Sequence, residues 1–77
     1  MNKITMSVWI KLNYGTHAKL NEALGLGKNT ANRWFNDDPR KFFQYIPQLS
    51  KDSDTPLDDL VQIIEQRIVD VEALRSK

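Results

Sequence analysis

Glycine and proline divide this 77-residue chain into segments that have the length of short helices. Gly15 and Gly25 each follow a run of helix-forming residues, and glycine ends helices because it adopts left-handed backbone at low cost. Pro39 and Pro56 follow an aspartate and a threonine, an order typical of a helix start. This spacing predicts an all-α fold, a compact bundle of about five helices in which the C-terminal helix is the longest.

The first segment, residues 4–13, is compatible with two structures. Ile4, Val8 and Leu12 recur at helical spacing, yet apolar residues also alternate along the segment as they do in a strand. The polar residues 50–54 are predicted to form a loop before the last helix. The remaining helical segments are predicted at residues 16–25, 28–36, 38–47 and 56–74.

Size and composition exclude several classes of protein. A chain this short supports one core, so residues 1–77 are expected to form a single domain. It has no cysteine and one histidine, His17, so we expect no disulfide, metal site or cofactor. No apolar run approaches the roughly 20 residues of a membrane span, and no signal-peptide pattern opens the chain. A cytoplasmic protein is therefore expected.

Charge is distributed unevenly along the chain. Residues 1–44 carry seven Lys and Arg against three Asp and Glu, whereas residues 45–77 carry four against seven, so the halves have net charges of +4 and −3. A polyanion would be held by the positive half and repelled by the negative half. The alternative is a chance difference between two solvated surfaces.

The stretch GLGKNT, residues 25–30, has some features of a phosphate-binding loop. A Walker-type loop requires a glycine, four residues and then Gly-Lys followed by Ser or Thr. Here Glu22 stands where the first glycine should be and Asn29 stands where the hydroxyl should be, and no strand precedes the stretch. These departures argue against nucleotide binding.

A tight turn between two helices explains the same stretch better. Gly25 is the turn residue, where a positive φ must be tolerated. The apolar residues required on both sides of such a turn are Leu20, Leu24, Leu26, Ala31 and Trp34. On the third helix Phe35 joins Ala31 and Trp34 on one face. The opposite face is polar and carries Lys28, Asn29, Asn32, Arg33 and Asn36.

This polar face has the chemistry for reading DNA bases. An arginine can pair with guanine O6 and N7, and an asparagine amide can pair with adenine N6 and N7. We predict base contacts by Lys28, Asn29, Asn32 and Arg33. The alternative is a solvated helix face without a ligand.

The segment THAKLNEALGLGKNTANRWFND, residues 16–37, resembles the helix-turn-helix of the lambda-repressor-like superfamily, which includes phage repressors and Cro proteins. The resemblance implies that residues 4–13 form the first helix of a five-helix domain. It also implies that the start of the third helix enters the major groove. Asn21 stands where the family usually has alanine, and Ala31 stands where it usually has valine or isoleucine, so the packing between the two helices is expected to differ locally.

The resemblance also implies contacts with DNA phosphates. In this family the start of the second helix sits against a phosphate, where free amide groups and the helix dipole favour an anion. Thr16, His17 and Lys19 occupy that region. Arg40 and Lys41, just beyond the third helix, are predicted to be further phosphate contacts. Phosphate contacts position such a protein, and base contacts provide the specificity.

Aromatic residues could stack on unpaired bases, as they do in proteins that bind single strands. Most of them lie at helical spacing beside other apolar residues, so we expect them to form the core instead. They are Trp9, Trp34, Phe35, Phe42, Phe43 and Tyr45.

Catalysis is not expected. One histidine cannot support a convincing Ser-His-Asp set, and the acidic pairs at residues 37–38 and 58–59 resemble charges that complement helix dipoles. The sequence therefore predicts a binding protein rather than an enzyme.

The last helix carries a seam suited to oligomerisation. Its apolar residues recur at alternating spacings of four and three, as in a coiled coil. We predict a homodimer, and the alternative is a helix buried wholly within its own monomer. The seam residues are Leu57, Val61, Ile64, Ile68 and Val71.

Together these features predict a sequence-specific, nucleoid-associated regulator of transcription that binds double-stranded DNA. We expect a repressor that acts as a homodimer on inverted half-sites, without a membrane or small-molecule partner. The resemblance makes an origin in a phage or mobile element plausible. The alternative is a helical protein-interaction module, such as an antitoxin or a phage-encoded inhibitor, that binds a partner protein through its last helix.

Overall fold

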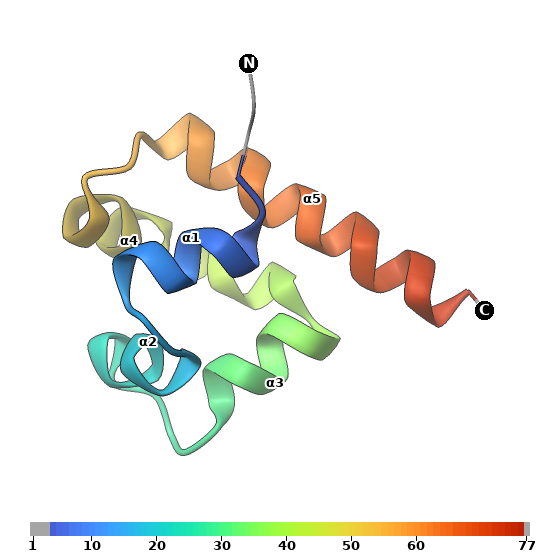
Figure 1. Cartoon of the computed structure of the whole chain (residues 1–77), viewed down its shortest axis with the longest axis horizontal. Coiled ribbons are helices and arrows are strands. Elements are labelled where there is room, and N and C mark those ends of the chain that lie inside the picture. The colour runs from blue at the N-terminus through green and yellow to red at the C-terminus, as the bar shows by residue number, and fades with distance from the viewer. Residues whose placement is uncertain (1–3, 77) are drawn as a thin grey trace.

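Six helical elements follow one another in the computed structural model, which describes residues 4–76 (Figure 1). The predicted all-α class is confirmed for these residues, none of whose helices is long and apolar enough to cross a membrane. Lys3 and Lys77, counted in the charge comparison, lie outside the described residues. The elements are α1 (Met6–Asn13), α2 (His17–Leu24), α3 (Thr30–Asp37), the 3-10 helix η1 (Pro39–Tyr45), α4 (Ile46–Ser53) and α5 (Leu57–Arg75).

Local signals set most helix boundaries. The Thr5 hydroxyl accepts a hydrogen bond from the Val8 amide at 3.2 Å and caps α1, so residues 4–13 contain a helix and not a strand. Thr16 caps α2 in the same way. Gly25 ends α2 with a φ of 66°, as its predicted role in the turn requires.

The third helix begins later than predicted. Asn29 has a φ of 63°, which is left-handed backbone and cannot belong to an α-helix. Lys28 and Asn29, predicted to lie on this helix, are therefore in the turn before it, and α3 starts at Thr30. Asparagine tolerates this conformation better than most residues, which suits it to the position.

The predicted loop at residues 50–54 is mostly helical. Residues 50–53 are the end of α4, a helix whose first turn contains Pro47. Their polar composition concealed the helix, which packs on the core through the fully buried Leu49 and the half-buried Ile46. The helix ends at Asp54, which has a φ of 55°.

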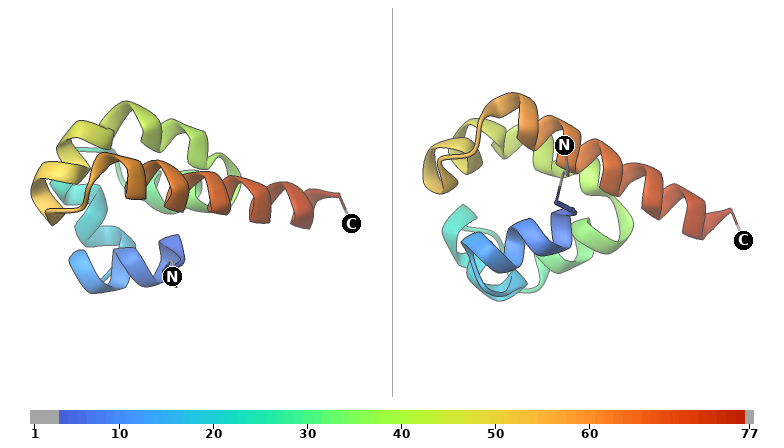
Figure 2. Two further views of the ribbon diagram at one scale, coloured as in Figure 1. Left: turned by 90° about the horizontal axis from the view of Figure 1, so that it is seen from above. Right: turned by 45° about the horizontal axis from the view of Figure 1, so that its top comes forward.

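The core lies between α5 and the other helices. In Figures 1 and 2, α5 crosses the molecule and its C-terminal end projects beyond the body, while α2 and α3 lie together away from the start of α5. Trp9 ties α1 to the loop before α5, because its indole N–H donates to the Thr55 hydroxyl at 3.1 Å. The fully buried side chains include Trp9, Ile10, Leu20, Phe42, Leu49, Leu60 and Ile64.

The aromatic residues contribute to this core. Trp9, Phe35 and Phe42 are buried, while the other aromatic residues of the predicted set are half-buried and packed against them. The Trp34 ring, for example, meets Phe42 edge-on at 5.4 Å between centroids. The structure thus confirms core packing for this set.

Tyr14 is less well accommodated. Its hydroxyl is buried and has no hydrogen-bond partner among the described residues. Burial raises the pKa of Tyr14 above its ordinary value of 10.0, and the charge of Asp52 raises it further.

Most of the predicted dimer seam on the last helix is buried within the chain itself. Ile64, Ile68 and Val71 are no more than 8% exposed, because they pack into the core of their own chain. Only Leu57 of the predicted set is exposed, and Val61 is half-buried. The spacing of a coiled-coil seam is the same whether the helix packs on its own domain or on a second copy, so the sequence pattern could not distinguish the two.

Candidate nucleic-acid interface

Helix α3 has one buried face and one exposed polar face. Ala31 and Phe35 are buried against the core, as the sequence predicted. Asn32, Arg33 and Asn36 are exposed on the other side. An eight-residue helix has little stability of its own, so its orientation must be set by its surroundings.

The start of α3 is held by a side chain from α2. Asn29, the residue before the helix, makes no side-chain capping bond. Asn21 supplies the missing cap, because its amide oxygen accepts a hydrogen bond from the Ala31 backbone N–H at 3.0 Å. The amide nitrogen of Asn21 also donates to the Leu26 carbonyl in the turn at 3.1 Å. Asn21 therefore joins α2, the turn and α3.

The end of α3 is held by two arginines of α5. Arg67 donates from Nε to the Phe35 carbonyl at 2.8 Å, and its guanidinium lies 3.8 Å from the centre of the Phe35 ring. Arg75 donates to the Asp37 carbonyl. The last carbonyls of a helix lack partners within it and carry partial negative charge, so cations are favourable there. Helix α3 is thus fixed at both ends.

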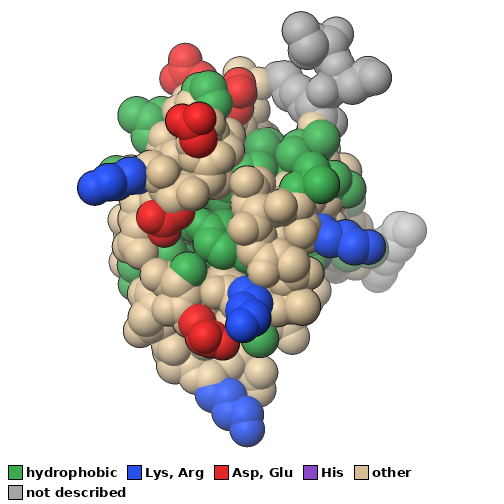
Figure 3. Space-filling model, turned by 60° about the vertical axis from the view of Figure 1, so that its left-hand side comes forward, with side chains coloured by type: hydrophobic (Ala, Val, Ile, Leu, Met, Phe, Trp, Pro, Cys, Tyr) green, Lys and Arg blue, Asp and Glu red, His purple; other side chains and the backbone are tan. Residues whose placement is uncertain are grey.

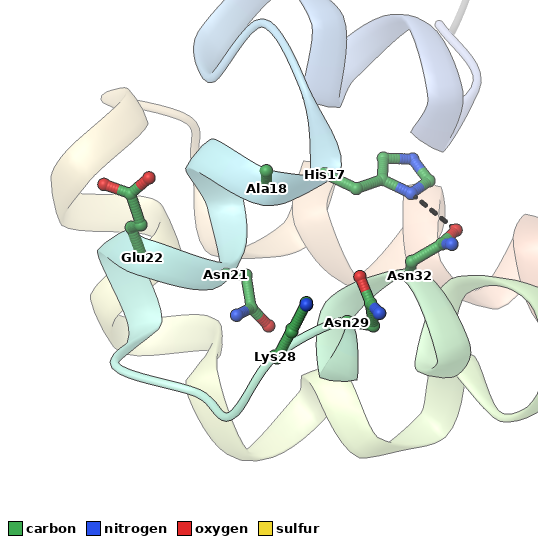
Figure 4. A pocket seen from close by; sticks show the side chains of 7 residues that line it. All are labelled: His17, Ala18, Asn21, Glu22, Lys28, Asn29 and Asn32. Atoms are coloured by element: carbon green, nitrogen blue, oxygen red, sulfur yellow. Dashed lines mark hydrogen bonds between the residues drawn. The ribbon is translucent and has the colours of Figure 1, made fainter.

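His17, at the start of α2, contacts the exposed face of α3. Its Nδ1 lies 3.0 Å from the side-chain oxygen of Asn32, and Figure 4 shows the two side chains pointing toward each other. Asn36 donates from Nδ2 to the same oxygen at 2.9 Å and to the Asn32 backbone carbonyl at 3.0 Å. The His17 ring also packs against Phe35, with 4.7 Å between ring centroids.

A groove of about 500 Å³ separates α2 from the start of α3 (Figure 4). It brings together three of the four predicted base-reading residues, Lys28, Asn29 and Asn32, with His17. Arg33 is exposed on α3 but does not line the groove. The groove also contains Glu22, a carboxylate that the sequence analysis did not assign to the site. Glutamate opposes a phosphate but can accept a hydrogen bond from the amino group of cytosine.

The residues predicted to contact phosphates differ in their exposure and in the bonds they already make. The Thr16 hydroxyl is already used as a helix cap, whereas Lys19 and Lys41 are exposed. Arg40 forms an ion pair with Glu72 of α5 at 2.8 Å, and that hydrogen bond raises the pKa of Arg40. A phosphate would have to compete with Glu72, although an exposed pair of this kind is weak.

The uneven charge of the sequence is visible on the surface. On the face drawn in Figure 3, acidic side chains lie mostly toward the top, where α5 begins, and basic side chains lie mostly lower, toward α2. Asp58 and Asp59 in the first turn of α5 belong to the acidic end. Arg67 and Arg75 belong to the acidic half of the sequence, residues 45–77, and both donate to backbone carbonyls of α3.

The sequence did not predict the contacts of Asn21 and Arg67, although it indicated that Asn21 would alter the packing between the two helices. Asn21 and Arg67 each contact backbone groups far along the chain, ten and 32 residues away, and no spacing rule covers such distances.

Comparison of the chain with protein-family models, curated protein sequences and solved structures finds no match.

Proposed function

We propose that this protein binds double-stranded DNA, with α3 and the turn before it in the major groove. One observation carries the proposal: α3 is braced at both ends, and its exposed face presents the amide and guanidinium groups of Asn32, Arg33 and Asn36, with the carboxylate of Asp37 at its C-terminal end. A helix held so firmly, with hydrogen-bonding groups that have no role in the core, is suited to reading a rigid partner.

The dimensions support this proposal. An α-helix with its side chains is about 10 to 12 Å in diameter, and the major groove of B-DNA is about 12 Å wide. The exposed Lys19 and Lys41 would lie on the flanking phosphates and make binding depend on salt.

Regulation by repression is the simplest consequence of such binding. A protein that occupies an operator excludes polymerase without a further domain. Binding as a homodimer would place two copies of α3 about 34 Å apart, one helical turn of DNA. The proposed contact is the projecting end of α5, where Val69 and Leu74 are 57% and 63% exposed, in place of the buried seam.

A second function, binding of a partner protein, is favoured by a different surface. Val8 and Leu12 of α1, with Ile4 just before the helix, form an exposed apolar stripe. Figure 3 shows apolar side chains gathered on the side where the described chain begins. A protein-interaction module would use this stripe together with the projecting end of α5.

The decisive experiment selects binding sites for the purified protein from a random duplex library at near-physiological salt. An enriched sequence that the Arg33→Ala variant no longer recognises at one position supports base reading. Lys51→Ala is the matched control, since Lys51 is an exposed cation on α4, away from α3, and should leave the selected sequence unchanged. Binding without an enriched sequence, lost as salt rises, contradicts the proposal.

A further inference from the structure

The hydrogen bonds around Asn32 determine which way its side-chain amide faces. The Asn36 side-chain atom that lies 3.0 Å from the Asn32 backbone carbonyl must be the NH₂ group, because a carbonyl oxygen only accepts hydrogen bonds. The same NH₂ group lies 2.9 Å from a side-chain atom of Asn32, which must therefore be the amide oxygen. The backbone carbonyl thus resolves the orientation of both amides.

The position of the His17 hydrogen follows from this orientation. Nδ1 of His17 lies 3.0 Å from the Asn32 amide oxygen, so Nδ1 must carry a hydrogen and donate it. The contact with Phe35 keeps the imidazole ring in place. A neutral His17 then has only an acceptor left at Nε2, which is unsuited to a phosphate, so the predicted phosphate contact would require the imidazolium form.

Asn32 consequently faces a ligand as a donor. Its amide oxygen has two lone pairs, and His17 and Asn36 occupy both. The usual pairing of asparagine with adenine needs that oxygen to accept from N6 while the NH₂ group donates to N7. Guanine instead presents two acceptors, N7 and O6, at the major-groove edge, whereas thymine presents one and cytosine presents a donor.

We propose that Asn32 reads guanine rather than adenine, and that His17 and Asn36 are positioning residues that impose this choice. The inference rests on the proposed function, because it concerns which base α3 selects once DNA is bound. It changes the adenine pairing that the sequence alone suggested for this asparagine.

Asn32→Ala first identifies the base pair that Asn32 reads, as the position at which the selected sequence loses its preference. In the unmodified protein we expect guanine there, favoured over adenine by about tenfold, within the range of one well-formed base contact. The preference is measured by competition between two duplexes that differ only at that position.

Three variants then test the positioning role. His17→Phe keeps the ring against Phe35 but removes the donor, so Asn32 is free to turn and the preference for guanine should fall to about threefold or less. His17→Asn places an amide nitrogen where Nδ1 was and should restore the preference. Asn36→Ala, at an exposed position, removes the second donor without disturbing the His17 ring and should also weaken the preference. Far-UV circular dichroism establishes that each variant is folded.

Two results would overturn the inference and leave the proposed function intact. One is adenine at the Asn32 position in the unmodified protein, and the other is a guanine preference that does not change in either His17→Phe or Asn36→Ala. If the proposed function is wrong, neither the unmodified protein nor any variant will enrich a sequence, and this outcome is distinct from the two results above.

Discussion

Replacement of Asn21 by alanine tests whether this residue holds α3 in position. The substitution removes the acceptor of the Ala31 N–H and the donor to the Leu26 carbonyl. Ala31 is buried, so its N–H has no access to water, and the loss compares with the loss of an N-cap, about 1 kcal/mol. Leu26 is half-buried and water can partly replace the second bond, which limits that cost to roughly 0.5 to 1 kcal/mol.

The intrinsic helix preference acts in the opposite direction. Alanine is favoured over asparagine inside a helix by about 0.6 kcal/mol. The net expectation is that Asn21→Ala lowers the free energy of unfolding by about 1 to 1.5 kcal/mol. For a chain of this size the melting temperature should fall by about 4 to 12 °C.

Urea and thermal unfolding followed by circular dichroism measure the effect. Asn13→Ala is the matched control, since the Asn13 side chain makes one local bond, to the Trp9 carbonyl, at the exposed end of α1. Its expected effect is within about 0.5 kcal/mol. Asn21→Asp keeps an acceptor for Ala31 and should fall between the unmodified protein and Asn21→Ala. The reasoning is refuted if Asn21→Ala and Asn13→Ala have the same stability, because the two Asn21 bonds that join α2 to the turn and to α3 would then contribute nothing.

Three further predictions concern DNA binding, the turn and Tyr14. Arg33→Ala should weaken binding by about 1 to 3 kcal/mol at one base position, whereas Lys41→Ala should weaken all sequences alike and reduce the salt slope by about one unit; equal effects in fluorescence-anisotropy titrations would contradict a reading helix. Gly25→Ala should lower the free energy of unfolding in urea by about 1 to 2 kcal/mol. The added Cβ meets no neighbour, so the whole cost comes from the positive φ. Gly27→Ala lacks that strain and should cost less than about 0.5 kcal/mol. The pKa of Tyr14 is raised in the folded protein, so the contribution of this group to stability is complete below pH 10 and is lost as the pH rises through the pKa of the folded protein. Unfolding measured in alkaline buffers should show this loss of stability, and the loss should be smaller in Tyr14→Phe.

The candidate site was only partly predictable from the sequence. The residues of the exposed face of α3, Asn32 and Arg33, follow from helical periodicity, which also places Ala31 and Phe35 in the core. The periodicity could not show that Asn32 is already bonded to His17, because the two are 15 residues apart and belong to different helices.

What the sequence determined by itself is local. Thr16 caps a helix and Gly25 ends one because a side-chain oxygen or a missing Cβ acts on the backbone within a few residues, and these effects do not depend on the rest of the fold. The buried face of a helix is also a local property, since it follows from the spacing of apolar residues.

The tertiary structure alone decided which surfaces meet. The apolar seam of α5 is compatible with a second copy or with its own core, and only the packing of α1, η1 and α4 against α5 makes it a core seam. In the same way, Asn21 and Arg67 hold α3 only because the fold brings its terminal backbone groups to them. Such contacts depend on the three-dimensional path of the chain, and the identity of the residues leaves that path open.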